Sequence, residues 1–149
     1  MLTIARALVD QIVAHARADH PDEACGVVTG PAGADRPVRF VPMTNAERSP
    51  TFYKFDPVEL LKLDREVDDL DEEIVIVYHS HTATEAYPSR TDVSYAAYAP
   101  DAHYVLVSTR DETETEFRSF RIVGGDFEGG RRVGAEVVEE EVVVVEPAG

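Results

Sequence analysis

Two histidines and an aspartate lie in one short segment of the chain. His79 and His81 are spaced by one residue at the end of the apolar run 74–78, and Asp92 follows eleven residues after the second histidine. Because residues i and i+2 of a β-strand point to the same face of a sheet, the two imidazoles should converge on one point. Two histidines and one carboxylate leave the fourth position of a tetrahedral metal open, which is typical of a catalytic zinc site.

The aspartate lies at a predicted helix start. Ser89 and Asp92 form a Ser-x-x-Asp pattern of the kind that caps a helix, so a helical turn would add an oxygen to the two nitrogens. Without a metal, the histidines could simply flank a turn, and Ser89 with Asp92 could be only a capping box. The metal hypothesis also explains why two polar rings end a buried strand, where polar groups need partners.

A hydrolytic metal site also needs a general base. Glu23 stands just before a second apolar strand, predicted over 25–29, which could lie beside the strand that carries the histidines. Asp22 is the competing candidate on spacing alone. Both acids could also be solvated charges that only begin the strand.

Two motifs resemble one protein family. The signature H-x-H-x7-S-x2-D of JAMM (MPN-plus, Mov34/PAD-1) metalloproteases is matched at every fixed position, here His79, His81, Ser89 and Asp92. The family's glutamate motif, P-x-E-x-C-G-x3-G, is matched by residues 21–30. The resemblance implies one zinc ion held by the two histidines and Asp92. It further implies that Glu23, and not its neighbour, is the general acid and base, and that Ser89 stabilises the tetrahedral intermediate.

The resemblance extends to family members from actinobacteria that release cysteine from the C-terminus of a ubiquitin-like sulfur carrier. Four segments carry this likeness: 20–31, 42–57, 78–93 and 100–111. It implies a zinc metallopeptidase of cysteine biosynthesis that hydrolyses the bond between the carrier's C-terminal Gly-Gly and an attached cysteine. It also suggests that the loop containing Asn45, Arg48 and Ser49 lines a substrate groove. The alternatives are a JAMM isopeptidase acting on another ubiquitin-like conjugate and a non-catalytic MPN scaffold, although such scaffolds have usually lost metal ligands.

Composition narrows the class of protein. The length of 149 residues predicts a single domain over 1–149. The chain has neither an apolar run long enough for a membrane span nor the pattern of a signal peptide, and its one cysteine excludes an internal disulfide, so we expect a cytoplasmic protein. The formal charge of −15 argues against nucleic-acid binding. The oligomeric state stays open, a homodimer included.

The predicted fold class is α/β, more closely an α+β-type mixed sheet with flanking helices, as the JAMM resemblance also implies. Hydrophobic periodicity and capping signals predict helices over 3–18, 57–70 and 90–99, the second capped by Asp56. Apolar and β-branched runs predict strands over 25–29, 38–43, 52–55, 74–78, 103–108, 116–123 and 142–145, with the glycine pairs 124–125 and 129–130 in turns.

Other titratable residues have simpler interpretations. Cys25 is a candidate nucleophile, but a free cysteine is most often a small buried hydrophobe. His103 opens a predicted strand, where a local structural role is favoured over one that faces the site. His15 and His20 are expected at the surface, and the acidic run 139–141 is expected to form an exposed turn.

Overall fold

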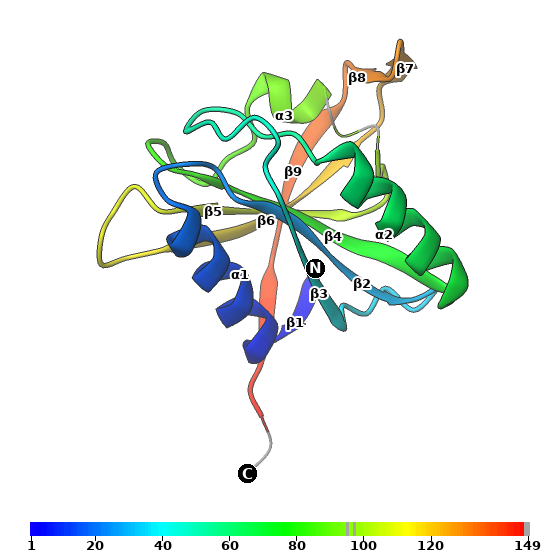
Figure 1. Cartoon of the computed structure of the whole chain (residues 1–149), viewed down its shortest axis with the longest axis horizontal. Coiled ribbons are helices and arrows are strands. Elements are labelled where there is room, and N and C mark those ends of the chain that lie inside the picture. The colour runs from blue at the N-terminus through cyan, green and yellow to red at the C-terminus, as the bar shows by residue number, and fades with distance from the viewer. Residues whose placement is uncertain (95, 97, 148–149) are drawn as a thin grey trace.

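The computed structural model describes residues 1–94, 96 and 98–147 (Figure 1). Within these residues a central six-stranded sheet has the strand order β3-β2-β4-β5-β6-β9. Its strands, in that order, are Arg39–Met43, Cys25–Pro31, Glu72–His81, His103–Ser108, Glu116–Val123 and Glu136–Glu140. Strands β4 and β5 pair in parallel, and the other neighbouring pairs are antiparallel. The predicted mixed sheet is confirmed, and the strands predicted over 103–108 and 116–123 have the observed bounds.

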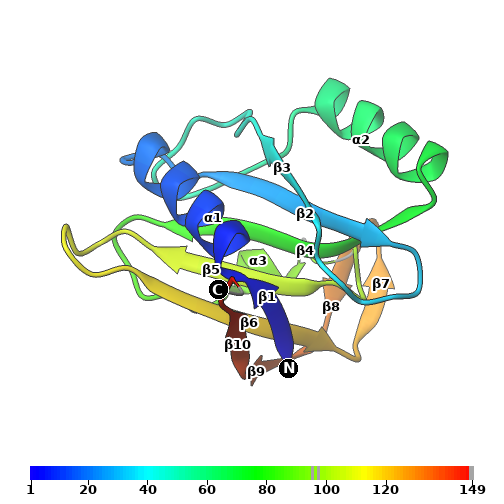
Figure 2. The same ribbon diagram turned by 90° about the horizontal axis from the view of Figure 1, so that it is seen from below.

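Helices α1 (Arg6–Asp19) and α2 (Pro57–Asp69) cover opposite faces of the sheet (Figure 1), and α1 lies in front of the sheet in the view of Figure 2. The alternation of β4 explains this arrangement, because Tyr78 packs into the core under α1 while Val77 packs into the core under α2. The Asp56 side chain accepts hydrogen bonds from the backbone of Val58 and Glu59, which confirms the predicted N-cap of α2. No helix among the described residues is long and apolar enough to cross a membrane.

Tyr78 also explains a glycine of the glutamate motif. Gly26 lies directly opposite Tyr78 across the β2–β4 pair, and a Cβ atom at this position would collide with the tyrosine ring. The Tyr78 hydroxyl forms a 2.6 Å hydrogen bond with Nδ1 of His15. The His15 side chain is only 16% exposed, so the prediction of a surface position was wrong. His20 is exposed, as predicted.

The first residues of the chain differ from the prediction. Residues Leu2–Ala5 form strand β1, which pairs in parallel with β10 (Val142–Val145). The predicted helix over 3–18 therefore begins late, at Arg6. Leu2 and Ile4 are buried while their neighbours are exposed, a period of two that a strand satisfies and a helix does not. The strand predicted over 142–145 is confirmed.

Three further expectations need correction. The predicted strand over 52–55 is only an isolated bridge between Asn45 and Phe55. Helix α3 (Arg90–Ser94) is shorter than the helix predicted over 90–99, of which residues 95 and 97 lie outside the described part. A hairpin of β7 (Asp126–Glu128) and β8 (Arg131–Val133) was not expected. Its turn is the glycine pair 129–130, which was predicted to lie in a turn, and both glycines have positive φ.

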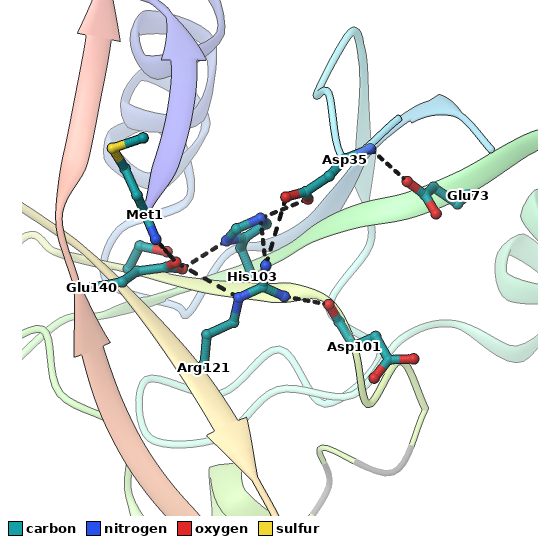
Figure 3. Close-up of polar contacts among 8 residues, drawn as sticks. Met1, Asp35, Glu73, Asp101, His103, Arg121 and Glu140 are labelled. Atoms are coloured by element: carbon teal, nitrogen blue, oxygen red, sulfur yellow. Dashed lines mark hydrogen bonds and ion pairs between the residues drawn. The ribbon is translucent and has the colours of Figure 1, made fainter. Parts of the chain in front are cut away.

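The acidic run 139–141 was also misplaced, because Glu140 belongs to β9 and its side chain is only 6% exposed. Figure 3 shows its carboxylate beside His103, whose Nδ1 lies 2.7 Å away, with the Met1 amino group and Arg121 on the other oxygen. Nε2 of His103 in turn lies 2.8 Å from Asp35. Burial alone would raise the pKa of Glu140, but the hydrogen bonds that its carboxylate accepts from His103 and the Met1 amino group lower this pKa. His103 therefore has a local structural role, as predicted.

This cluster predicts a large difference between two adjacent glutamates. Glu140→Ala should lower the free energy of unfolding by about 3 kcal/mol, because it leaves buried polar partners uncompensated. Glu139→Ala should lower the free energy of unfolding by less than about 1 kcal/mol, because the Glu139 side chain is 47% exposed and its ion pair with Arg118 lies at the surface. Urea unfolding of the two variants and the wild type at neutral pH measures both effects. Equal losses would contradict the structural role assigned to Glu140.

Candidate metal centre

Hydrogen bonds between β2 and β4 place Glu23 beside the two histidines. The antiparallel register pairs Cys25 with His79, so the residues just before β2 lie next to the end of β4. Ser80, between the histidines, donates its backbone N–H to the carbonyl of Ala24 at 3.0 Å, and its Oγ accepts from the Ala24 N–H at 2.8 Å. These two bonds fix the backbone that follows Glu23 against the segment that carries both histidines.

The structure brings His79, His81 and Asp92 together at one point. The two Nε2 atoms lie 3.3 Å apart, and Oδ2 of Asp92 lies 3.2 Å from that of His79 and 3.1 Å from that of His81. Ligands about 2.0 Å from a tetrahedral zinc are separated by about 3.3 Å, so these spacings match the edges of such a site. Two imidazoles and one carboxylate are also a donor set that zinc accepts, and the three side chains fit a zinc ion.

Glu23 stands near this triplet but is more loosely placed. One oxygen of its carboxylate and one ring nitrogen each of His79 and His81 all lie within 4.8 Å of one another. The Asp92 oxygen lies only 3.1 to 3.2 Å from the two histidine nitrogens, so the triplet with Asp92 is the compact donor set and Glu23 lies beside it. The Glu23 side chain is buried, and this burial raises its pKa to about 7 against the opposing effect of the two histidines. A carboxylate with a pKa near neutrality is suited to take up and return a proton.

The carboxylate of Asp92 is held by the predicted capping box. Its Oδ2 accepts a 2.8 Å hydrogen bond from the backbone N–H of Ser89, and Oγ of Ser89 accepts one of 3.1 Å from the N–H of Asp92. Burial alone would raise the pKa of Asp92, but the two histidines and the Ser89 amide hold it well below its usual range. Within the described residues the Ser89 hydroxyl donates to no acceptor, so its proton remains free for another group.

Two contacts at the site were not expected from the sequence. The ring of Tyr53 stacks on the ring of His79, with centroids 4.4 Å apart and planes 23° from parallel. Nδ1 of His81 lies 2.9 Å from the backbone carbonyl of Glu85, which orients its other nitrogen toward Asp92. Spacing along the chain carries no signal for either contact, because both depend on how the loops 44–55 and 82–89 fold back over the strand end.

Two remaining candidates are placed clearly. Cys25 is fully buried, and burial raises the pKa of its thiol to about 12, which favours the structural interpretation over the nucleophile. The loop with Asn45, Arg48 and Ser49 is attached to Glu23, whose N–H donates to the Ser49 carbonyl and whose own carbonyl accepts from the Asn45 side chain. Arg48 and Asn45 line a cavity of about 600 Å³ together with Glu23.

Comparison with known families shows which family the chain belongs to. Residues 5–123 match the family described as prokaryotic homologs of the JAB domain. The chain belongs to the JAB family. Its peptidase character is supported by a CysO-cysteine peptidase from Mycobacterium tuberculosis, which is 61% identical over 98% of this chain and 92% of that protein. A desampylase from Haloferax volcanii is 30% identical over 81% of this chain and 94% of its own length.

The fold is also that of a known JAB structure. The crystal structure of AF2198, a JAB1/MPN domain protein from Archaeoglobus fulgidus, aligns with 97% of this chain and 99% of its own, with a TM-score of 0.53. At 18% identity this likeness concerns the fold alone. The mixed sheet with few helices is thus the JAB/MPN architecture, as the sequence motifs led us to expect.

The ligand geometry predicts zinc in the purified protein. We expect about one zinc ion per chain, since three protein ligands and one open position make a single catalytic site. His79→Ala should lose the metal because it removes one of the three, whereas His20→Ala, at an exposed histidine away from the triplet, should retain it. Metal analysis by mass spectrometry measures the content. Full zinc in both His79→Ala and Asp92→Ala would rule out this ligand set.

Proposed function

We propose that this JAB-family peptidase is a zinc enzyme that hydrolyses the bond between the C-terminal Gly-Gly of a ubiquitin-like sulfur carrier and an attached cysteine. The proposal depends on one observation: three ligand atoms converge at 3.1 to 3.3 Å, with Glu23 buried beside them. The 61% identity to a CysO-cysteine peptidase supports this substrate and a place in cysteine biosynthesis. The single cysteine, which is buried and free, is compatible with a cytoplasmic enzyme.

His79, His81 and Asp92 would hold the zinc ion in this proposal. Bound there, zinc would supply Lewis acidity, which polarises a carbonyl and acidifies water. The protein supports this arrangement from outside, because the Glu85 carbonyl fixes the ring of His81 and the Ser89 amide fixes the carboxylate of Asp92. Such supporting hydrogen bonds set the orientation of metal ligands.

Glu23 would carry the proton. It would accept a proton from the attacking water and deliver it to the departing amine of the cysteine. A pKa of about 7 lets one carboxyl group perform both transfers near neutral pH. The Ser80–Ala24 hydrogen bonds hold its backbone in place, so Ser80 is a positioning residue for this step.

Ser89 would serve two purposes. Its Oγ already accepts a hydrogen bond from the backbone of Asp92, and its hydroxyl proton is free to donate to the oxyanion that develops on the scissile carbonyl. The capping and the catalytic interpretations are compatible, because the first uses a lone pair of the oxygen and the second uses its hydrogen.

A Gly-Gly tail suits such a site. Glycines let the backbone approach the reacting centre without a Cβ atom in the way, and an extended tail can pair with a strand edge. The folded body of the carrier would supply most of the affinity. The second candidate function is an isopeptidase on another ubiquitin-like conjugate, which the similarity to a desampylase favours. A non-catalytic scaffold is disfavoured by the complete set of ligands.

The role of Glu23 can be separated from that of its neighbour. Glu23→Gln should keep its zinc and lose turnover by about 10²-fold or more, the contribution typical of general acid–base catalysis. Asp22→Asn should change turnover far less, because the adjacent carboxylate lies outside the histidine group. Steady-state rates and metal content of both variants are the measurements. Equal losses of turnover would show that the proton carrier is misassigned.

The substrate is tested with a carrier–cysteine adduct followed by mass spectrometry. Zinc-loaded enzyme should remove one cysteine mass and regenerate the Gly-Gly end, a zinc chelator should block the reaction, and the bare tail peptide should react poorly. Release of a lysine-linked conjugate without release of cysteine would favour the isopeptidase. Tight retention of the adduct without cleavage would favour the scaffold.

A further inference from the structure

Ser89 also lines a cavity of about 550 Å³, of which Tyr53 is not a lining residue. It lies between the segment around α3 and the β7–β8 hairpin, which projects beside α3 at the top of Figure 1. One wall is formed by residues 87–90 with Val93 and Ser94, and the opposite wall by residues 131–135 with Val137. A residue proposed to contact the reacting carbonyl therefore also lines this cavity.

The lining of this cavity is positively charged in a strongly acidic chain. Arg90, Arg131 and Arg132 line it, and no aspartate or glutamate does. The whole sequence has 29 acidic and 14 basic residues, so a lining with only basic charges is unlike its general surface. The cavity that contains Glu23 has a mixed lining, because Asp19 and Asp22 line it together with Arg48.

The arginines differ in how they are held. Arg132 is buried, donates hydrogen bonds to the carbonyls of Gly124 and Pro100, and lies over the ring of Phe127. It is a fixed positive charge of the wall. Arg90 follows Ser89 directly and is exposed, and no hydrogen bond or ion pair joins its guanidinium to any residue that the structure describes. It is therefore available to bind an anion.

The chemistry of the proposed substrate requires a cation near the site. A cysteine attached through its amino group at the end of a carrier has a free α-carboxylate on the same carbon as the scissile nitrogen. This negative charge must lie close to the reaction centre, where Glu23 and Asp92 would repel it. The pocket beside Tyr53 offers this carboxylate a single cation, Lys54, because the rest of its lining is aromatic and aliphatic side chains. The cavity at Ser89 has the complementary charge.

We propose that Arg90, supported by the charges of Arg131 and Arg132, binds the α-carboxylate of the terminal cysteine. This inference rests on the proposed function and extends it, because it explains how the enzyme would select a residue with a free C-terminus. A guanidinium pairs with a carboxylate through charge-assisted and often bidentate hydrogen bonds, which give orientation as well as affinity. The leaving group would then be held while Glu23 protonates its nitrogen.

The test compares two adducts that differ only in this charge. A carrier thioester ligated to cysteine or to cysteinamide gives substrates with a free or a blocked carboxylate. Zinc-loaded wild-type enzyme should cleave the acid with a kcat/KM higher by about tenfold or more, the effect of losing one charge-assisted pair, and mainly through KM. Arg90→Ala should remove this preference, because cleavage of the cysteine adduct slows while the rate on the cysteinamide adduct stays the same. Arg90→Lys should restore part of the preference.

The matched control is Arg65→Ala on α2, an exposed arginine outside the cavity, which should keep the wild-type preference. Because each ratio is measured on one enzyme preparation, partial unfolding of a variant cancels. Equal cleavage of both adducts by the wild type would overturn the inference and leave the proposed function intact. A preference that survives in Arg90→Ala and in the Arg90→Ala/Arg131→Ala double variant would also overturn it. Cleavage of neither adduct would count against the proposed function itself.

Discussion

The pairing of β2 with β4 is the constraint on which the site depends. It sets Cys25 opposite His79, and the two hydrogen bonds between Ser80 and Ala24 extend it to the residue after Glu23. A slip of one residue would turn every side chain of a strand to the other face of the sheet, so the histidines would point toward α1. Gly26 protects this register on the far face, because only a residue without a side chain fits against Tyr78.

The buried His103 and the buried pair His79 and His81 both lie beside carboxylates, but the arrangement of the atoms differs between the two clusters. His103 uses its two ring nitrogens for two different carboxylates, so each of its polar atoms is satisfied within the protein. His79 and His81 instead direct one nitrogen each at the same oxygen of Asp92. Three candidate ligand atoms crowded around one point are stabilised best by a cation between them, whereas the His103 cluster already contains the cations of Met1 and Arg121.

Spacing and motifs predicted the triplet and the position of Glu23 near it, but they did not predict the contacts made by loops and by the last strand of the sheet. The spacing of His79, His81 and Asp92 was informative because a strand end and a helix start follow each other directly, and the observed triplet agrees with it. The stacking of Tyr53 on His79 and the burial of Glu140 could not be predicted, since both partners come from distant segments. Strand β1 was read as helix because four residues are too few to distinguish the two periods.

The triplet and the proton carrier come from different parts of the chain. All three proposed ligands lie between His79 and Asp92, while Glu23 reaches them only through the β2–β4 pairing. Under the proposed roles, metal binding and turnover would therefore change independently when single residues are substituted. In the proposed site, an uncharged residue at position 23 would leave the three ligands and the cavity at Ser89 in place, so the protein would become a receptor for the same tail. One nucleotide change is enough to begin that divergence, and one is enough to reverse it.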